Sequence, residues 1–188
     1  AILIPARAGS KRLKNKNIFK FKSMPMIYWS IKASKNTAFK NNLYVTGGSA
    51  GGIMTAWIVG KTKRFKAAAV IKPVMNWISK TLVADNYFYY ANSRYKGQPW
   101  ENFEEYWKFS PISLVGNIET PTMVMVGLND LRTPPSEAKQ LYHALKLRKI
   151  ETVYVEIPGA YHNISNKPSQ LITKIDHILY WFNKYRNK

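Results

Sequence analysis

Cysteine is absent from this sequence of 188 residues, and its absence excludes disulfides, thiolate catalysis and cysteine-ligated metal. Acidic residues are scarce, with 10 Asp and Glu against 29 Lys and Arg. No apolar run approaches the roughly 20 residues that a membrane-spanning helix needs, so we expect no membrane partner. Histidine occurs three times. The candidates for a catalytic base can therefore be compared one by one.

The excess of basic residues gives a formal net charge of +19, which is typical of proteins that bind polyanions. The lysines are spread along the chain, without an arginine-rich block or the aromatic signature of RNA-binding domains. A bias of composition toward lysine is the alternative explanation. We expect weak, salt-sensitive and non-specific polyanion binding rather than a specific nucleic-acid partner.

Length and composition fit one folded domain, with 46% hydrophobic and 14% aromatic residues. The first residues, "AILIPARAGSKR", are apolar and then basic, which is the reverse of a secretory signal. We expect a cytoplasmic protein, or a periplasmic one if a signal has been removed. The start on Ala1 within an expected strand also suggests a fragment or a processed chain.

Apolar runs and chain breakers alternate regularly along the sequence. Strands are predicted at residues 1–6, 42–47, 66–74, 122–127 and 152–159. Helical spacing is found at residues 24–36, 49–61, 136–148 and 169–185. Strands that alternate with helices predict an α/β fold, with a mostly parallel sheet and helices on both faces.

An aromatic-rich region of about residues 76–116 interrupts this alternation, and we expect it to be largely irregular. Excursions of this length in compact domains are often lids or walls of a binding site. The alternative is a helical insertion whose aromatic side chains only pack together. Trp77, Tyr87, Phe88 and Trp100 suggest an aromatic-lined substrate pocket, although aromatic residues at such spacing are core residues at least as often.

The stretch "LYVTGGSAGG" carries a G-x-S-x-G pattern at residues 47–51, between an expected strand and an expected helix. This context favours Ser49 as a nucleophile on a sharp turn. The flanking glycines are expected to leave room where side chains would clash with the strand and the helix. The N–H of Ala50, at the start of the helix, is expected to face the developing oxyanion.

A serine nucleophile needs a base, and the base needs an orienting acid. His143 and His177 lie within expected helices, whereas His162 follows the strand at 152–159. Asp130 directly follows the strand at 122–127, and catalytic groups gather at such strand ends in α/β sheets. We therefore prefer Ser49, Asp130 and His162, in the chain order of α/β-hydrolases. The alternative for Asp130 is a structural ion pair with the nearby Arg132.

From about residue 42 to the end, the chain resembles the C-terminal half of a prolyl oligopeptidase family catalytic domain. The matching stretches include "LYVTGGSAGG", "TMVMVGLNDLRTPPSEAKQLYHALK" and "VEIPGAYHNISNKPSQ". The resemblance implies an α/β-hydrolase fold with Ser49 as nucleophile, Asp130 as orienting acid and His162 as general base. It also implies substrate contacts from the region that begins at Trp77, with Trp77 and Tyr87 as candidates. The fold is expected to be truncated at its N-terminal side, without the HGG-type loop that supplies a second oxyanion donor.

The first 36 residues or so resemble the opening of acylneuraminate cytidylyltransferases instead, in "ILIPARAGSKRLKNKNI" and "MPMIYWSIKAS". The matching nucleotide-contacting positions are Arg7, Gly9, Ser10, Lys11, Arg12, Lys16 and Asn17. The alternative for this stretch is a solvated basic loop. The whole then looks like a chimera, with a nucleotidyltransferase-like segment at 1–40 and a hydrolase region at 41–188 within one compact domain.

These observations predict a serine hydrolase or peptidase that cleaves peptide or acyl-ester bonds, with weak turnover if an oxyanion donor is missing. No cofactor and no metal is expected, and the oligomeric state is left open. Two other functions stay as alternatives. One is a CTP-binding or cytidylyltransferase-like module, and the other is an inactive scaffold or polyanion binder.

Overall fold

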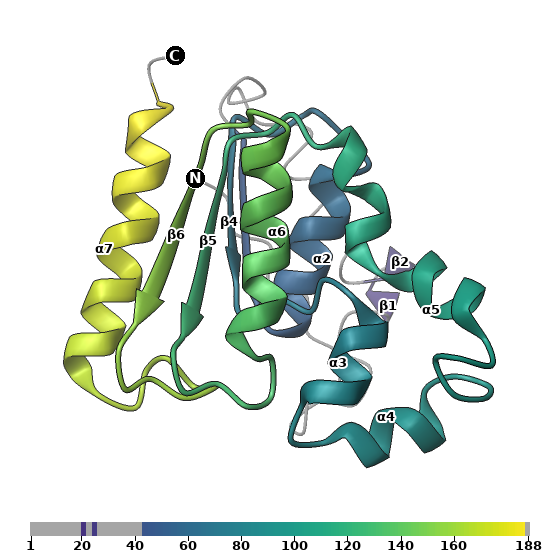
Figure 1. The fold of residues 1–188 in the computed structure, drawn as a ribbon. Coiled ribbons are helices and arrows are strands. Elements are labelled where there is room, and N and C mark those ends of the chain that lie inside the picture. The colour runs from purple at the N-terminus through teal and green to yellow at the C-terminus, as the bar shows by residue number, and fades with distance from the viewer. Residues whose placement is uncertain (1–19, 22–23, 26–42, 187–188) are drawn as a thin grey trace.

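The computed structural model describes residues 20–21, 24–25 and 43–186. Its main feature is a four-stranded sheet in which every neighbouring pair is parallel. The strands, in their spatial order, are β3 (Tyr44–Gly48), β4 (Ala67–Ile71), β5 (Thr122–Gly127) and β6 (Thr152–Ile157). The carboxyl ends of all four therefore lie at one edge, where the arrowheads of β5 and β6 are drawn in Figure 1.

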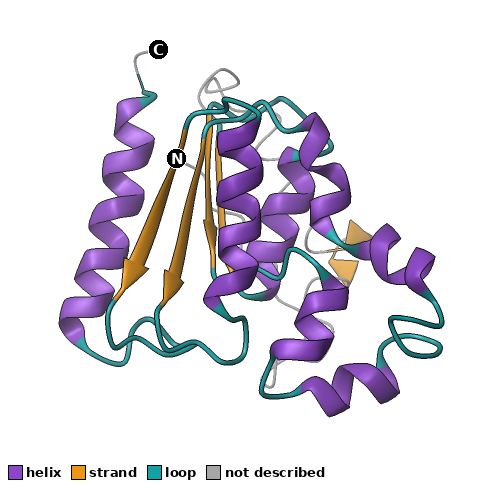
Figure 2. Cartoon of the chain, in the orientation of Figure 1, coloured by secondary structure: helices purple, strands orange, loops and turns teal. Residues whose placement is uncertain are grey.

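Three long helices separate and cover these strands, namely α2 (Ala50–Val59), α6 (Pro135–Leu147) and α7 (Pro168–Lys184). Figure 2 shows the helices flanking the strands. Both α6 and α7 begin with proline, whose missing N–H is not needed in the first helical turn. The predicted α/β fold, with a parallel sheet and helices on both faces, is confirmed.

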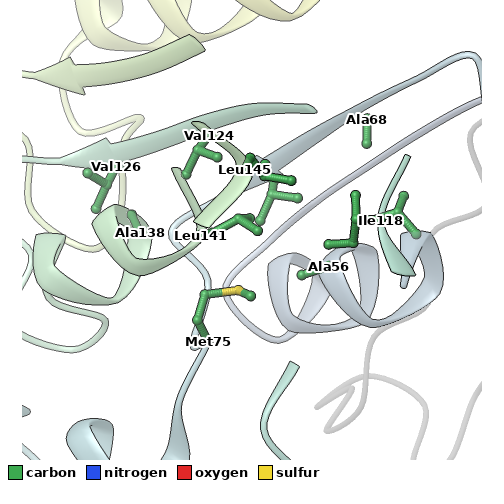
Figure 3. Packing of buried hydrophobic residues seen from close by; sticks show 11 residues of the cluster. Ala56, Ala68, Met75, Ile118, Val124, Val126, Ala138, Leu141 and Leu145 are labelled. Atoms are coloured by element: carbon green, nitrogen blue, oxygen red, sulfur yellow. The ribbon is translucent and has the colours of Figure 1, made fainter. Parts of the chain in front are cut away.

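The two faces of the sheet carry separate hydrophobic clusters. Alternate residues of the buried central strands β4 and β5 point to opposite faces, as the period of a strand requires. On one face, Ala68 and Val124 pack with Leu141 of α6 and Ala56 of α2 (Figure 3). On the other face, Ala69 and Met125 join Trp181 of α7 in a second cluster. The sheet is thus buried on both sides, and its carboxyl edge is left for the loops.

The region at 76–116 is a helical insertion, which corrects the expectation of a largely irregular segment. It contains α3 (Trp77–Val83), α4 (Tyr87–Ser93), α5 (Phe103–Phe109) and the 3-10 helix η1 (Pro111–Asn117). Each has seven residues, too few for a hydrophobic period to become visible in the sequence. An asparagine precedes each of the three α-helices, and the Asn76 side chain accepts a hydrogen bond from the N–H of Ile78.

The N-terminal region is described only at four residues, which form a short antiparallel pair between β1 (Lys20–Phe21) and β2 (Met24–Pro25). Met24 and Pro25 are therefore in a strand rather than in the helix predicted for 24–36. The rest of that helix, the strand predicted at 1–6 and the seven nucleotide-contacting candidates lie outside the described residues. In the described part of the chain, no helix is long and apolar enough to cross a membrane.

Candidate active site

Ser49 occupies the sharp turn between β3 and α2, in a backbone conformation that serine rarely adopts. Its φ is 59° and its ψ is −120°, and it is the N-cap residue of α2. The Ser49 N–H donates to the carbonyl of Ile71 on the neighbouring strand at 3.0 Å. Such a conformation costs about 1–3 kcal/mol and persists because the surrounding structure holds it. Because Ser49 directly follows β3, its side chain lies at the carboxyl edge of the sheet.

Two glycines allow this turn, namely Gly47 and Gly52, whereas the motif suggests Gly47 and Gly51. A Cβ at Gly47 would lie 2.3 Å from the carbonyl oxygen of Gly51. A Cβ at Gly52 would lie 2.5 Å from the carbonyl oxygen of Ile71, so this helix residue must also lack a side chain. By contrast, a Cβ at Gly51 meets nothing within 4 Å among the described residues. The expected clash on the helix side thus belongs to Gly52.

The first turn of α2 presents backbone donors beside Ser49. The first hydrogen bond within the helix runs from the N–H of Ile53 to the carbonyl of Ser49, at 3.0 Å. The N–H groups of Ala50 and Gly51 precede it and take no part in the helical ladder. Ala50 is exposed. The N-terminus of a helix favours negative charge, so this end of α2 suits an oxyanion.

His162 lies in the loop between β6 and α7 and bridges the two other candidate residues. Its Nε2 is 2.9 Å from Ser49 Oγ, and its Nδ1 is 2.9 Å from Asp130 Oδ2. His143 and His177 are exposed on α6 and α7, and the Nδ1 of His177 lies 2.8 Å from the carbonyl of Thr173. The structure therefore brings together the three side chains that the sequence singled out, and leaves the other two histidines on the surface.

Asp130 is completely buried in the loop after β5, and its carboxylate is held by several donors. Oδ1 accepts the N–H groups of Arg132 and Thr133, both at 2.9 Å, and Oδ2 accepts the Thr133 hydroxyl at 2.9 Å. Burial alone would raise the pKa of Asp130, but the hydrogen bonds from His162 and Thr133 outweigh it and lower that pKa. Asp130 is therefore an anion beside the imidazole at neutral pH.

Arg132 makes its ion pair with a different aspartate from the one considered in the sequence. Its Nε lies 2.7 Å from Oδ1 of Asp85, at the end of α3. The N–H of Asp85 also donates to the carbonyl of Leu131 at 2.9 Å. The insertion is thus tethered to the loop that carries Asp130, and the Arg132 guanidinium pairs with Asp85 rather than with Asp130.

The two aromatic candidates for substrate binding differ in their surroundings. Trp77 is only 5% exposed and packs in a small core with Val74 and Tyr106, which agrees with the alternative that it is a core residue. A buried indole offers no surface to a substrate. Tyr87 is 57% exposed on α4, beside the exposed Phe88. The insertion therefore combines a packed aromatic core with an exposed aromatic surface.

Two residues near the site were not predicted from the sequence, namely Thr133, which bonds to Asp130, and Glu137, which holds the start of the insertion. Glu137 is buried at the start of α6, and its Oε2 accepts the N–H groups of Met75 and Asn76 at 2.9 Å. Burial raises the pKa of this carboxyl group, although these hydrogen bonds oppose the rise. The Asp130-to-Thr133 spacing is a turn signal that could have identified Thr133. Glu137 acts on residues about 60 positions away, and no local pattern reveals that.

No group of three or more metal-ligating side chains occurs in the part of the chain that the structure describes. The candidate site is instead a linear chain of hydrogen bonds from Asp130 through His162 to Ser49. In this arrangement the protonated Nδ1 donates a hydrogen bond to Asp130. The unprotonated Nε2 can then accept the proton of the serine hydroxyl. The geometry can thus generate a nucleophilic oxygen at Ser49.

Comparison with known families gives two matches along the chain. The family model described as "Prolyl oligopeptidase family" matches residues 26–188. A model described as "Cytidylyltransferase" matches residues 1–48. The first match contains all the helices and strands of the candidate site, whereas the second ends at the strand before Ser49.

Individual proteins show the same similarity. The uncharacterized peptidase YuxL of Bacillus subtilis is 41% identical over 145 residues, which cover 76% of this chain and 22% of YuxL. The acylamino-acid-releasing enzyme of Arabidopsis thaliana is 33% identical over 153 residues, which cover 77% of this chain and 20% of that enzyme. The chain thus spans about a fifth of the length of these curated relatives.

Among solved structures, the acylaminoacyl peptidase of Pyrococcus horikoshii superposes with a TM-score of 0.77 at 23% sequence identity. The superposition covers 86% of this chain and 27% of that structure. At this level of identity the likeness establishes the fold, and the α/β-hydrolase arrangement agrees with the parallel sheet described above.

Proposed function

The chain belongs to the prolyl oligopeptidase family, and we propose that it acts as a serine hydrolase on peptide or acyl-ester bonds. The observation that carries this proposal is the hydrogen-bonded series of Ser49, His162 and Asp130, at 2.9 Å for each link. Ser49 is also held at the positive φ of a nucleophile on a sharp strand-to-helix turn. A serine that only filled a tight turn would need neither partner.

In the proposed reaction, Ser49 Oγ attacks the carbonyl carbon of the substrate while Nε2 of His162 takes its proton. The imidazolium that forms is stabilised by the Asp130 carboxylate at Nδ1. His162 then returns the proton to the leaving group, and an acyl group stays on Ser49. Water attacks this acyl-enzyme with His162 again as the base, and serine is regenerated.

The N–H of Ala50 is the proposed first donor to the oxyanion. It follows Ser49 directly and lies in the unpaired first turn of α2, where a developing negative charge is favoured. A second donor is not assigned among the described residues. Removal of one oxyanion donor typically slows a serine hydrolase about 10²–10³-fold, so turnover by this chain depends strongly on whether that donor is present.

The proposed substrates are simple esters and, as the name of the Arabidopsis relative suggests, N-acylated peptides. The test measures release of p-nitrophenol from p-nitrophenyl butyrate, and of p-nitroaniline from an N-acetylated amino acid p-nitroanilide. We expect faster turnover of the ester, because its leaving group needs less protonation by His162. The Ser49→Ala variant serves as the matched control. Equal rates for wild type and this variant would contradict a role of Ser49 as nucleophile.

Nucleotide binding is a second candidate function, favoured by the match of residues 1–48 to a cytidylyltransferase model. The candidate contacts in that segment are Arg7, Gly9, Ser10, Lys11, Arg12, Lys16 and Asn17. Cationic side chains and backbone N–H groups suit a triphosphate. The chain would then join part of a nucleotide-binding family to a hydrolase region.

Calorimetric titration with CTP tests this second candidate, with the Lys11→Ala/Arg12→Ala double variant as control. A specific site predicts affinity that the double variant loses and that survives moderate salt. Because the chain carries a net charge of +19, CTP also has a non-specific attraction to it. If wild type and the double variant bind CTP with equal affinity, and added salt abolishes both, the binding comes from the bulk charge. That result would contradict a specific nucleotide site. If the protein is an inactive polyanion-binding scaffold, we expect this salt-sensitive binding and no ester hydrolysis.

A further inference from the structure

Lys72 directly follows β4 and has a backbone conformation that lysine rarely adopts. Its φ is 42°, in the left-handed region that favours glycine and asparagine. Pro73 comes next and further restricts the backbone of the residue before it. The Lys72 N–H donates to the carbonyl of Met125 on β5 at 2.6 Å. The sheet thus holds this unusual backbone in place, and that fixes where the side chain leaves β4.

The Lys72 side chain connects the two loops that carry the proposed nucleophile and base. Its Nζ donates a hydrogen bond to the backbone carbonyl of His162, which lies 90 residues further along the chain. The same side chain runs against the nucleophile turn, since a Cβ added at Gly48 would lie 3.3 Å from Lys72 Cε. Lys72 therefore lies against the residue before Ser49 and also bonds to His162.

The charge of Lys72 suits this connection. Partial burial lowers the pKa of its ammonium, Asp130 opposes that change, and Lys174 of α7 adds to it. A protonated amine makes a stronger hydrogen bond to a carbonyl than a neutral donor does. Residues 158–167 form no helix or strand between β6 and α7, so His162 depends on individual contacts of this loop. The Lys72 bond is one of them, and the bond from the Asn129 N–H to the Ala160 carbonyl, at 2.9 Å, is another.

We propose that Lys72 is a positioning residue that anchors the His162 loop against the nucleophile turn. Its ammonium fixes the His162 backbone and so keeps the imidazole at hydrogen-bonding distance from Ser49. The catalytic consequence rests on the proposed hydrolase function, whereas the anchoring does not. Lys72 bonds to the backbone of His162, away from the imidazole that would move the proton. Loss of the anchor should therefore lower kcat and leave KM nearly unchanged.

Three variants separate the anchor from general structural effects. Lys72→Met keeps the length of the side chain and removes the ammonium, while Lys72→Arg keeps a cationic donor. Lys72→Asn removes the reach but suits the positive φ, so its melting temperature should equal or exceed that of Lys72→Met. Hydrogen–deuterium exchange of the peptide at 158–167 measures the anchor without any need for activity. Hydrolysis of p-nitrophenyl butyrate measures its consequence.

We expect Lys72→Met and Lys72→Asn to exchange faster than wild type in this peptide and in no other, with kcat lowered about tenfold or more. A tenfold loss corresponds to about 1.4 kcal/mol of lost transition-state stabilisation. Lys72→Arg should recover most of both properties. Unchanged exchange in Lys72→Met overturns the anchor, and unchanged kcat overturns its role in positioning the base. If wild type hydrolyses no ester, the hydrolase proposal fails, and the exchange result still decides the anchor.

Discussion

The Nε2 of His162 lies 2.9 Å from Oγ of Ser49, although 113 residues separate them in the sequence. Two different strand ends produce this contact. Ser49 follows β3, whereas His162 lies in the loop after β6, at the other side of the four-stranded sheet. Because parallel strands bring their carboxyl ends to one edge, residues far apart in sequence meet there.

The strained backbone of Ser49 predicts a trade-off between stability and activity. Glycine tolerates a φ of 59°, whereas alanine is strained there just as serine is. Ser49→Gly should therefore have a free energy of unfolding about 1 kcal/mol higher than Ser49→Ala, while both are inactive. Urea denaturation of the two variants measures this difference. Equal stabilities would mean that the turn stores no strain at Ser49.

The glycines of the nucleophile turn predict different outcomes for the same substitution. Gly47→Ala and Gly52→Ala place a Cβ 2.3 Å and 2.5 Å from backbone carbonyl oxygens, so the turn must shift. We expect each to lower the free energy of unfolding by roughly 2 kcal/mol or more and to abolish ester hydrolysis. Gly51→Ala is the matched control, since its Cβ meets no described atom within 4 Å. It should stabilise α2 by up to about 1 kcal/mol. Destabilisation by all three alike would contradict the assignment of the close contact to Gly47 and Gly52.

Asp130→Asn should impair the base without loss of the fold. Oδ1 accepts two backbone N–H groups, so the amide oxygen of asparagine takes that place and its NH₂ group faces His162 Nδ1. The imidazole then carries its proton on Nε2 and cannot accept one from Ser49. The equivalent change in a serine protease costs about 10⁴-fold in kcat, and we expect a loss of about 10³–10⁴-fold here. Asp176→Asn, on the exposed surface of α7, is the control and should leave the rate unchanged.

The buried Lys80 should make the free energy of unfolding rise as the pH becomes alkaline. This side chain is 1% exposed, with Nζ 2.7 Å from the Asn86 Oδ1 and 4.3 Å from the centre of the Tyr90 ring. Burial lowers the pKa of Lys80 to about 8, from about 10.4 in an unfolded chain. Between these values the unfolded state binds more protons, so stability increases with pH, by up to about 3 kcal/mol in total.

Chemical denaturation at pH 7, 8, 9 and 10 measures this dependence in wild type and in Lys80→Met. The reduction of the net charge at alkaline pH acts on both proteins alike. The difference between the two stabilities therefore reports Lys80 alone. It should become more favourable to wild type as the pH rises from 8 to 10. A constant difference would show that Lys80 titrates as it does in the unfolded chain.

Much of the sheet could be predicted because its strands are continuous apolar runs between chain breakers. The predicted strand at 122–127 agrees with β5, Thr122–Gly127. The strand predicted at 66–74 ends earlier, at Ile71, because Lys72 takes a positive φ and Pro73 has no N–H to donate. For the insertion, the sequence left a helical segment as one of two alternatives and gave no helix bounds, since helices of seven residues depend on tertiary packing rather than on a periodic pattern.

The same distinction applies to the candidate site. Ser49, Asp130 and His162 follow predicted strands, so the parallel arrangement was enough to place them at one edge. Lys72 and Glu137 could not be found in this way, because their partners lie 90 and about 60 residues away in the sequence. The surroundings of Trp77 could not be predicted for a related reason. Aromatic residues in an insertion can pack or line a pocket, and only the neighbours decide.

The most direct test of the account is covalent labelling of the folded protein with a fluorophosphonate probe, followed by peptide mapping. Such probes react with a serine that a neighbouring base has activated. We predict one labelled site, on the peptide that contains Ser49, with no label in Ser49→Ala and much slower labelling in Asp130→Asn. No labelling of the folded wild type, or equal labelling of Ser49→Ala, would contradict the proposal that Ser49 is the nucleophile of a serine hydrolase.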